Sequence, residues 1–352
     1  MVEGGSHGRI SRRSYIKTGV AATGLGVLAG CTGLLGGGTT TLRANSPAAT
    51  GSVHGDAAEW LGDYVSEQTD GAVEIDAYRN SELGGQIESI ENVSSGSLDM
   101  YVIPYALTGT QYRPAQVFDA PYMYDDENPY ADIYEKTDPQ ESDIAKQVID
   151  DLVSETSIRS LGAVVQGTRR VTLNVEGEPP RNPQQMSNYK MRAVPIAMYS
   201  EALKGLGAQT TNIDFSEVPQ ALATGSIQGQ ENPYNIIRSS GIWEHQNTVL
   251  ETDHMHVPLA IIINDDVFQD LSGDQQQVLY DGVREIQPQA TETLEANLAD
   301  HRSFMEEKGL TIVPPEDLEM DTFRTAVRSR IRENFPDLID TIEELHGDGY
   351  PA

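Results

Sequence analysis

The chain has 352 residues and a formal net charge of −30 at pH 7, from 24 Lys and Arg against 54 Asp and Glu. This acidic excess excludes nucleic-acid binding, because neutralising phosphates requires clustered Lys and Arg. It also predicts a halophilic protein, since concentrated salt screens the repulsion between carboxylates. A chain of this length exceeds what one hydrophobic core usually organises, so two lobes are expected.

The first 30 residues have the features of an export signal. An arginine pair at 12–13 precedes an apolar stretch at 18–30, which is too short and too rich in Gly and Ala to span a membrane. The pair resembles a twin-arginine signal, and the Leu-Ala-Gly-Cys that ends at Cys31 resembles a lipobox. We therefore expect residues 1–30 to be a signal peptide, Cys31 to carry a lipid, and residues 31–41 to form a Gly/Thr-rich tether. The protein would then be anchored to the outer face of the cell membrane.

Cys31 is the only cysteine in the sequence, which excludes a disulfide framework and a Cys-based metal or redox site. Its position directly after the apolar stretch favours lipidation. An incidental or buried thiol is the alternative interpretation.

After the tether, the sequence alternates between helical and strand patterns. An apolar face repeats with helical spacing over 53–67, and period-2 alternation over 73–78 predicts a half-buried strand. The same criteria predict further strands at 98–103 and 190–194, and further helices at 86–93, 196–206, 217–223 and 318–346. This succession predicts an α/β fold built from βα units.

Two short segments recur at a constant offset along the chain. Gly96-Ser97-Leu98 recurs as Gly225-Ser226-Ile227, and Pro104-Tyr105 recurs as Pro233-Tyr234. In both copies a short helix is predicted before the Gly-Ser pair, and a strand leads from it into the Pro-Tyr loop. The repeat predicts two lobes of similar construction, each presenting a loop at a strand end, where α/β proteins bind ligands. Chance similarity of short motifs is the alternative.

The longest helical pattern covers 272–308. Ser272 and Gln275 form a capping-box pattern at its start, Gly309 is a C-terminal stop, and Pro288 predicts a kink near the middle. At 1.5 Å per residue the helix would be roughly 50 Å long, enough to cross from one lobe to the other. Two consecutive helices broken at Pro288 are the alternative.

The chemistry that the sequence indicates is carboxylate binding rather than catalysis. It has no Gly-rich phosphate loop, no G-x-S-x-G and no H-E-x-x-H. His254 and His256 would share a strand face, but no further ligands lie nearby in the sequence, so structural histidines are favoured over a metal site. Arginine is scarce, yet Arg169, Arg170 and Arg192 stand beside predicted strands. A guanidinium matches a carboxylate through two parallel hydrogen bonds; surface ion pairing is the alternative for any one of them.

Two motifs in the second half of the chain are specific enough to indicate a family. KMRAVP occupies 190–195 and GSIQGQENP occupies 225–233. Weaker matches are Gly51-Ser52 with His54 and Ala57-Ala58, Gly71, Leu83-Gly84-Gly85, Gly96-Ser97-Leu98-Asp99, Gly207-Ala208, FSEV at 215–218 and Ala221-Leu222. Together they resemble the extracytoplasmic solute-binding subunit of the tripartite ATP-independent periplasmic (TRAP) transporters, over residues 45–310.

The resemblance implies ligand contacts at particular residues. The family's K-x-R arginine pairs with the ligand carboxylate and corresponds to Arg192. A supporting upstream arginine corresponds to Arg169, with Arg170 as the alternative. The asparagine after Q-E implies a ligand contact for Asn232, and the F-x-E aromatic implies packing of Phe215 on the ligand's carbon skeleton.

The loop after the Gly-Ser-Leu-Asp strand supplies specificity in the family. Here it reads Pro104-Tyr105-Ala106-Leu107 and lacks the Glu and Arg of sialic-acid-binding members, so a sugar acid of that kind is not expected. Tyr105 and its counterpart Tyr234 are expected to wall a smaller pocket with one hydroxyl each. Core packing is the alternative for both tyrosines.

The resemblance also implies a two-lobed, periplasmic-binding-protein-like fold that closes on its ligand about a hinge. We expect lobe I at 42–166 with 258–290, and lobe II at 167–257 with 291–346. The expected function is capture of a small organic carboxylate outside the cell and its delivery to the membrane subunits of a TRAP-type transporter. An ion gradient would drive transport, so no cofactor, ATP site or catalysis is expected.

Three other functions are compatible with parts of the sequence. A binding protein of an ATP-driven transporter would take amino acids, peptides or chelates. An anchored extracytoplasmic hydrolase would need a nucleophile and base, which no motif supplies. A structural envelope lipoprotein would bind no ligand.

Overall fold

The computed structural model describes residues 38–125, 127–347 and 349–351. The predicted signal peptide and Cys31 lie outside this part. The described strands form one nine-stranded mixed sheet of order β2-β1-β3-β8-β4-β7-β5-β6, in which β9 also pairs with β8. The strands are β1 (Thr40–Asn45), β2 (Val73–Ala77), β3 (Met100–Pro104), β4 (Ile158–Leu173), β5 (Lys190–Ala193), β6 (Gln209–Asn212), β7 (Gly229–Asn232), β8 (Thr248–Asn264) and β9 (Thr311–Val313).

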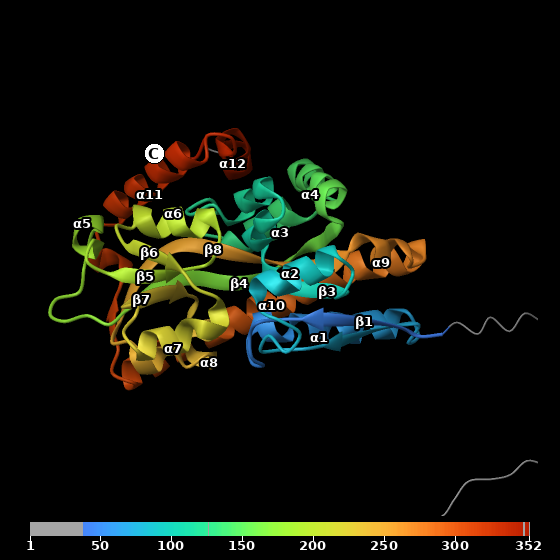
Figure 1. Ribbon diagram of the computed structural model, residues 1–352, viewed down its shortest axis with the longest axis horizontal. Helices are drawn as coiled ribbons and strands as arrows, with labels where there is room; N and C mark the ends of the chain where they lie inside the picture. Colours follow the sequence, from blue (N-terminus) through green and yellow to red (C-terminus); the bar gives the residue numbers. More distant parts are fainter. Residues whose placement is uncertain (1–37, 126, 348, 352) are drawn as a thin grey trace, which may run out of the picture. The chain divides into compact units, whose positions relative to one another are not determined.

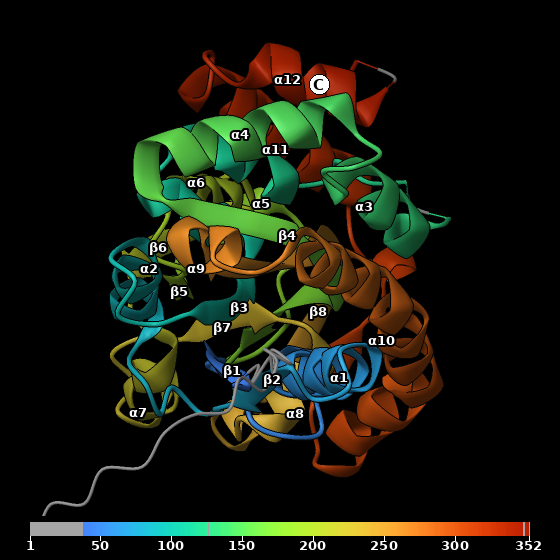
Figure 2. The same ribbon diagram turned by 90° about the vertical axis from the view of Figure 1, so that its right-hand side faces the viewer.

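Helices cover both faces of the sheet. Figures 1 and 2 show α4, α6 and α11 on one side of β4 and β8, and α1, α7 and α8 on the other. The α-helices are α1 (Val53–Gln68), α2 (Gln86–Ser94), α3 (Pro129–Thr137), α4 (Asp143–Thr156), α5 (Pro183–Met186), α6 (Ala197–Gly205), α7 (Val218–Ala223), α8 (Tyr234–Ser239), α9 (Asp265–Gln269), α10 (Gly273–Glu307), α11 (Met320–Asn334) and α12 (Ile339–His346). Short 3₁₀ helices are η1 (Tyr105–Thr110), η2 (Arg113–Asp119), η3 (Phe215–Glu217), η4 (Ile242–His245) and η5 (Pro315–Asp317).

The predicted elements up to residue 223 agree with α1, β2, α2, β3, β5, α6 and α7 to within about two residues at each end. The helix predicted at 318–346 is wrong, because the structure has two helices there, α11 and α12. The break falls at Phe335, which precedes Pro336, and a residue before proline is disfavoured in the helical region. The tether predicted to end at 41 overlaps β1, which begins at Thr40.

β4 and β8 form a long antiparallel pair through the centre of the sheet. β3 pairs with residues 259–263 of β8, toward the C-terminal end of that strand. β9 pairs with residues 248–250 at the other end of β8, and β7 pairs with residues 170–173 of β4. The sheet therefore has two regions, and β4 and β8 are the strands that belong to both.

The pairing of β4 with β8 shifts register where the two regions meet. Val165 lies opposite Pro258 and Gly167 opposite Val257, so one residue of β4 is extra at this point. Gly167 has a φ of 116°, a conformation that side-chain-bearing residues rarely adopt. A bulge of this kind bends a strand and increases its twist.

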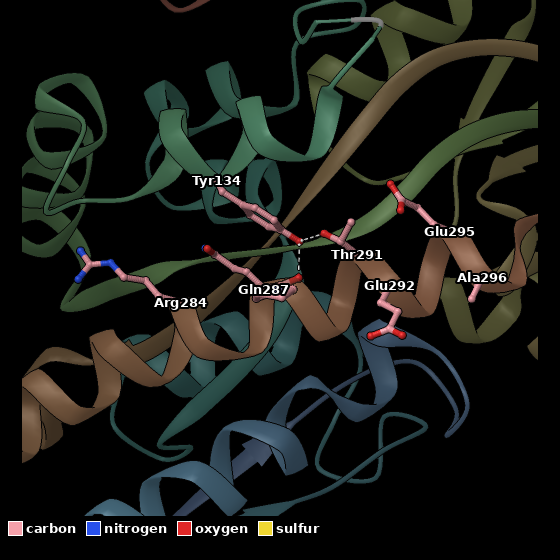
Figure 3. A pocket seen from close by; sticks show the side chains of 8 residues that line it. Tyr134, Arg284, Gln287, Thr291, Glu292, Glu295 and Ala296 are labelled. Carbon is pink, nitrogen blue, oxygen red and sulfur yellow. Dashed lines mark hydrogen bonds between the residues drawn. The ribbon is translucent and has the colours of Figure 1, made fainter.

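The long helix α10 is continuous through Pro288, so the single-helix interpretation is correct. Ser272 and Gln275 form the predicted capping box at its start. The helix packs against α1 and β4 and also against α8 and β9, so it contacts both regions of the sheet. Figure 3 shows Tyr134 of α3 pointing at this helix, where its hydroxyl donates to Gln287 O at 3.0 Å and shares a hydrogen bond with Thr291 Oγ1 at 2.8 Å.

Both copies of the sequence repeat adopt the predicted structure. A short helix, α2 or α7, precedes each Gly-Ser pair, and the strand β3 or β7 follows it. Gly96 and Gly225 have φ values of 73° and 69°, which explains glycine at both turns. None of the helices within the described residues combines the length and the apolar character needed to cross a membrane.

Candidate ligand-binding site

A small, largely enclosed cavity lies between the two regions of the sheet. It brings together side chains from α1, α2, η3 and α8 with the ends of β3, β5 and β7 and the interior of β4. The lining residues are Pro47, His54, Gln86, Pro104, Gln166, Arg169, Arg192, Val194, Phe215, Asn232 and Ile236. Four predicted site residues are therefore in one cavity: Arg169, Arg192, Phe215 and Asn232.

Arg192, at the end of β5, is a buried cation with only neutral protein partners. Its side chain donates from Nε to Ile213 O at 2.9 Å and from Nη2 to Gln86 Oε1 at 3.3 Å. No carboxylate within the described residues lies within ion-pair distance of it, and its Nη1 has no protein acceptor there. Burial lowers the pKa of Arg192 to about 10; the charge of Glu231 opposes this shift and that of Arg169 adds to it, and the guanidinium stays charged at neutral pH.

Arg169, on β4, is also buried, but it is neutralised by Glu231 of β7. Nε donates to Glu231 Oε2, and Nη2 donates to Glu231 Oε1 at 2.9 Å and to Glu231 O at 2.7 Å. Burial alone would raise the pKa of Glu231, but the guanidinium outweighs it and the pKa is lowered to about 2. The guanidinium also stacks 5.0 Å from the centre of the Tyr199 ring.

Gln166 and His54 fix the orientation of Arg169 from the cavity side. Arg169 Nη1 donates to Gln166 Oε1 at 3.0 Å, and Gln166 Nε2 lies 2.9 Å from His54 Nδ1. His54 Nε2 lies 2.9 Å from Val102 O, so this nitrogen carries the proton and Nδ1 accepts from the amide. The tautomer of His54 thus sets which way the Gln166 amide points.

His54 is neutral at physiological pH because burial lowers its pKa to about 4. A histidine whose folded pKa lies below its ordinary 6.5 stabilises the fold above pH 6.5, and this contribution is lost as the pH falls to about 4. Between pH 6.5 and about 4, we expect the free energy of unfolding of the wild-type protein to fall by about 3 kcal/mol relative to that of the His54→Gln variant. Denaturant unfolding of both proteins at several pH values measures the difference between their free energies of unfolding. Other titrating groups contribute equally to both proteins and cancel in this difference. One such group is Asp119, whose pKa is raised by burial to about 7. A difference that is independent of pH would contradict the prediction.

Asn232 and Phe215 complete the polar and apolar walls of the cavity. Asn232 is 2% exposed and donates from Nδ2 to Gln230 Oε1 at 2.5 Å. Phe215 is half-buried, and its ring centre lies 5.8 Å from the Arg192 guanidinium carbon. An anion on Arg192 would therefore have an aromatic face beside it.

The structure does not bring Tyr105 and Tyr234 to this cavity. Tyr105 turns into the core and packs against Phe118, with ring centres 4.4 Å apart. Tyr234 donates to Glu251 Oε1 at 2.8 Å and lies beside Arg170, on the opposite side of β4 from Arg169. Both tyrosines thus have the core-packing role that the sequence left as the alternative, and Arg170 is remote from the cavity as well.

The two histidines of β8 are hydrogen-bonded structural residues. His254 is fully buried, with Nδ1 2.8 Å from Thr252 Oγ1 and Nε2 3.4 Å from Glu231 Oε2. His256 Nδ1 lies 2.9 Å from Thr168 Oγ1. In the part of the chain that the structure describes, no cluster of three or more His, Cys, Asp or Glu side chains is arranged to hold a metal ion.

Sequence reasoning missed several residues that line the cavity or hold its arginines. Gln86, Gln166 and Glu231 had no assigned role, although Glu231 lies within the Gln-Glu-Asn motif and His54 within a weaker one. Their partners are distant in sequence, for example Gln86 and Arg192. The motif at 230–232 was the one available signal, because Glu231 stands between two amides and could have been predicted to pair with a site arginine.

A larger groove of about 930 Å³, which includes open solvent, lies over α10 around Pro288 (Figure 3). Glu292 and Glu295 line it and are exposed. Two solvated carboxylates repel an anionic ligand and offer little desolvation. The enclosed cavity with the two buried arginines is therefore the candidate ligand site.

Comparisons with known proteins agree with the fold. A model of the DctP family, bacterial extracellular solute-binding proteins of family 7, matches residues 44–337. The sialic acid-binding periplasmic protein SiaP of Vibrio cholerae is 26% identical over 294 residues, which cover 84% of this chain and 88% of that protein. The 2,3-diketo-L-gulonate-binding periplasmic protein YiaO of Escherichia coli is 25% identical over 299 residues, covering 82% and 87%.

A solved structure shows the same fold. The crystal structure of a TRAP periplasmic solute-binding protein from Roseobacter denitrificans with bound L-galactonate aligns with a TM-score of 0.78 at 25% identity, and covers 88% of this chain and 99% of that chain. The predicted two-lobed α/β fold is confirmed. The matching family is the family of TRAP-transporter binding proteins that the motifs predicted, and its members are binding proteins rather than enzymes. Since the family model spans most of the chain, the chain belongs to the DctP family of bacterial extracellular solute-binding proteins.

Proposed function

We propose that this protein captures a small organic carboxylate through Arg192 and delivers it to the membrane subunits of a TRAP-type transporter. The observation that carries the proposal is the charged guanidinium of Arg192, buried in the cavity wall with only neutral protein partners. An isolated buried charge is costly unless an opposite charge joins it. A carboxylate that accepts two hydrogen bonds from this fork supplies that charge.

The other proposed contacts divide between the two ends of the ligand. Phe215 would cover the carbon skeleton beside the carboxylate, and Asn232 would bond a hydroxyl or carbonyl oxygen. Arg169 would contribute its remaining donor capacity while held by Glu231 and Gln166. The relatives support this chemistry: one binds L-galactonate in its crystal structure, and another is named for sialic acid.

The proposed closure is a hinge motion between lobe I, at 42–166 with 258–290, and lobe II, at 167–257 with 291–346. The pairing supports these boundaries, because the register of β4 and β8 shifts at Gly167 and Val257, where the two regions of the sheet meet. Small-angle X-ray scattering tests this motion, because a bound ligand should reduce the radius of gyration. An unchanged radius would contradict closure.

The function is tested by a thermal-shift screen of the mature protein in molar KCl against organic acids. A ligand at a hundredfold excess over Kd adds about 2.7 kcal/mol to the free energy of unfolding, which is a measurable shift. A shift with one class of carboxylate supports the proposal. Shifts with amino acids or chelates alone would instead support an ATP-driven transporter's binding protein, and no shift with any compound would contradict ligand capture.

We further propose that Cys31 carries the lipid that anchors the protein outside the cell, and that the acidic chain is adapted to high salt. The apolar stretch before Cys31 and the net charge of −30 support these proposals. The wild-type protein should be recovered in the membrane fraction, and the Cys31→Ser variant should be recovered in the soluble fraction. The melting temperature should rise with KCl concentration. A soluble wild type, or a melting temperature that salt leaves unchanged, would refute the corresponding proposal.

A further inference from the structure

The charges around the cavity can be counted residue by residue. Of the lining side chains, only His54, Arg169 and Arg192 can carry a charge. His54 is neutral above its lowered pKa of about 4. Arg169 is neutralised by Glu231, whose two carboxylate oxygens both accept hydrogen bonds from the guanidinium. Arg192 is thus the one lining charge among the described residues that no acid in contact with it neutralises.

Asp214, the other acid whose charge raises the pKa of Arg192, does not form an ion pair with it. Its Oδ2 accepts from the Gln86 backbone N–H at 3.1 Å, and its Oδ1 accepts from Ser216 N at 3.0 Å and Oγ at 2.8 Å. Asp214 is partly exposed, so water screens its effect on the guanidinium. The wall therefore presents a net charge close to one positive unit to a ligand.

The rest of the wall offers no place for a second anionic group. Pro47, Pro104, Val194 and Ile236 are apolar. Gln86, Gln166 and Asn232 are neutral amides, which can form hydrogen bonds with a ligand but supply no positive charge. A second carboxylate enclosed here would be a desolvated charge without a cation.

We propose, on the basis of the proposed function, that this cavity selects acids with a single negative charge and rejects dicarboxylates of the same length. The buried Glu231 sets this selectivity, because it removes one of the two arginine charges from the ligand's side. The far end of the ligand would carry hydroxyl, carbonyl or amide groups that the neutral amides can bond. Glu231 is in this sense a specificity-determining residue that acts through Arg169.

Paired ligands test the inference in the wild-type protein. Calorimetric titrations would compare L-galactonate with galactarate, and butyrate with succinate, since each pair differs by one terminal carboxylate. The best monocarboxylate of the screen and its diacid counterpart would be added. The diacid is expected to bind about a hundredfold more weakly than its partner at pH about 7.5. Lowering the pH to about 5 should narrow this gap, because the second carboxyl of the diacid begins to protonate while Arg192 and Glu231 keep their charges.

The variant Glu231→Gln should shift the preference in the opposite direction. It restores the second positive charge, so the ratio of diacid to monoacid affinity should rise at least tenfold. Glu217→Gln, which removes an exposed charge next to Phe215, should leave the ratio unchanged. If Glu231→Gln does not fold, the pH titration of the wild type still decides the question.

The outcomes separate the inference from the function on which it rests. Binding of no acid in any pair overturns the proposed function and the selectivity with it. Equal or tighter binding of the diacids at pH about 7.5 overturns the selectivity alone and leaves carboxylate capture standing. If neither the pH nor Glu231→Gln alters a preference for monoacids, net charge is not its cause. The shape of the cavity would then be the cause of the selectivity.

Discussion

Replacing Arg192 by Lys is expected to weaken binding of the carboxylate ligand by about a hundredfold or more while leaving the fold intact. The guanidinium is held by Ile213 O and Gln86 Oε1, which leaves its outer nitrogens to form the fork that binds a carboxylate. A lysine ammonium keeps the charge but lacks the fork and hydrates more strongly. Disturbing one partner of a buried, hydrogen-bonded charge pair costs about 2–5 kcal/mol. Calorimetry with the ligand found in the screen measures the change.

The control for this experiment is Arg113→Lys. Arg113 is 43% exposed and pairs with Asp337 at 2.9 Å, and neither residue lines the cavity. The Arg113→Lys variant should bind the ligand with wild-type affinity. An Arg192→Lys variant with wild-type affinity would remove Arg192 from the ligand site.

Replacing Arg169 by Met is expected to lower the free energy of unfolding by about 3–5 kcal/mol. Arg169 and Glu231 are 1% and 0% exposed, so removal of the cation leaves a carboxylate buried without its partner. Breaking an exposed pair has little effect by comparison, and Lys146→Met, which breaks the surface pair with Asp150, should change stability by less than about 1 kcal/mol. Urea unfolding at constant KCl compares the variants.

The double variant Arg169→Met with Glu231→Gln should recover most of the loss, because it removes the buried charge as well. The pH dependence gives an independent check. The folded pKa of Glu231 is about 2, below its ordinary 4.5, so the pair stabilises the fold above pH 4.5 and the contribution is lost as the pH falls toward 2. Single and double variants of equal stability would show that the ion pair is not what holds this part of the core.

The sequence was sufficient to predict which residues of the short motifs line the candidate site. Arg192 and Asn232 stand in segments whose residue order alone indicates a role, and the structure brings both to one cavity. The repeat of Pro104-Tyr105 as Pro233-Tyr234 also located two strand ends correctly. It did not tell which side chain of each pair faces the cavity, because Pro104 lines it while Tyr105 turns inward.

The remaining features depend on contacts between distant segments. Gln86 of α2 contacts Arg192 of β5 although β3, which follows α2, is separated from β5 by three strands of the sheet, and no spacing in the sequence encodes that meeting. β4 and β8 are buried on both faces along most of their length, so their residues lack the alternation that marks a strand with one solvent face. Their extent was therefore not predictable from periodicity.

The place of β8 in the sheet has a consequence for how the chain folds during synthesis. β8 lies between β3 and β4, yet it is made after all of β1 to β7. Until residue 264 has emerged, the sheet consists of two half-sheets, β2-β1-β3 and β4-β7-β5-β6, with open edges at β3 and β4. Open apolar edges invite pairing with other chains, so the nascent protein passes through a stage that is vulnerable to aggregation. Insertion of one strand ends that stage and joins both lobes at once, which makes neither lobe an independent folding unit.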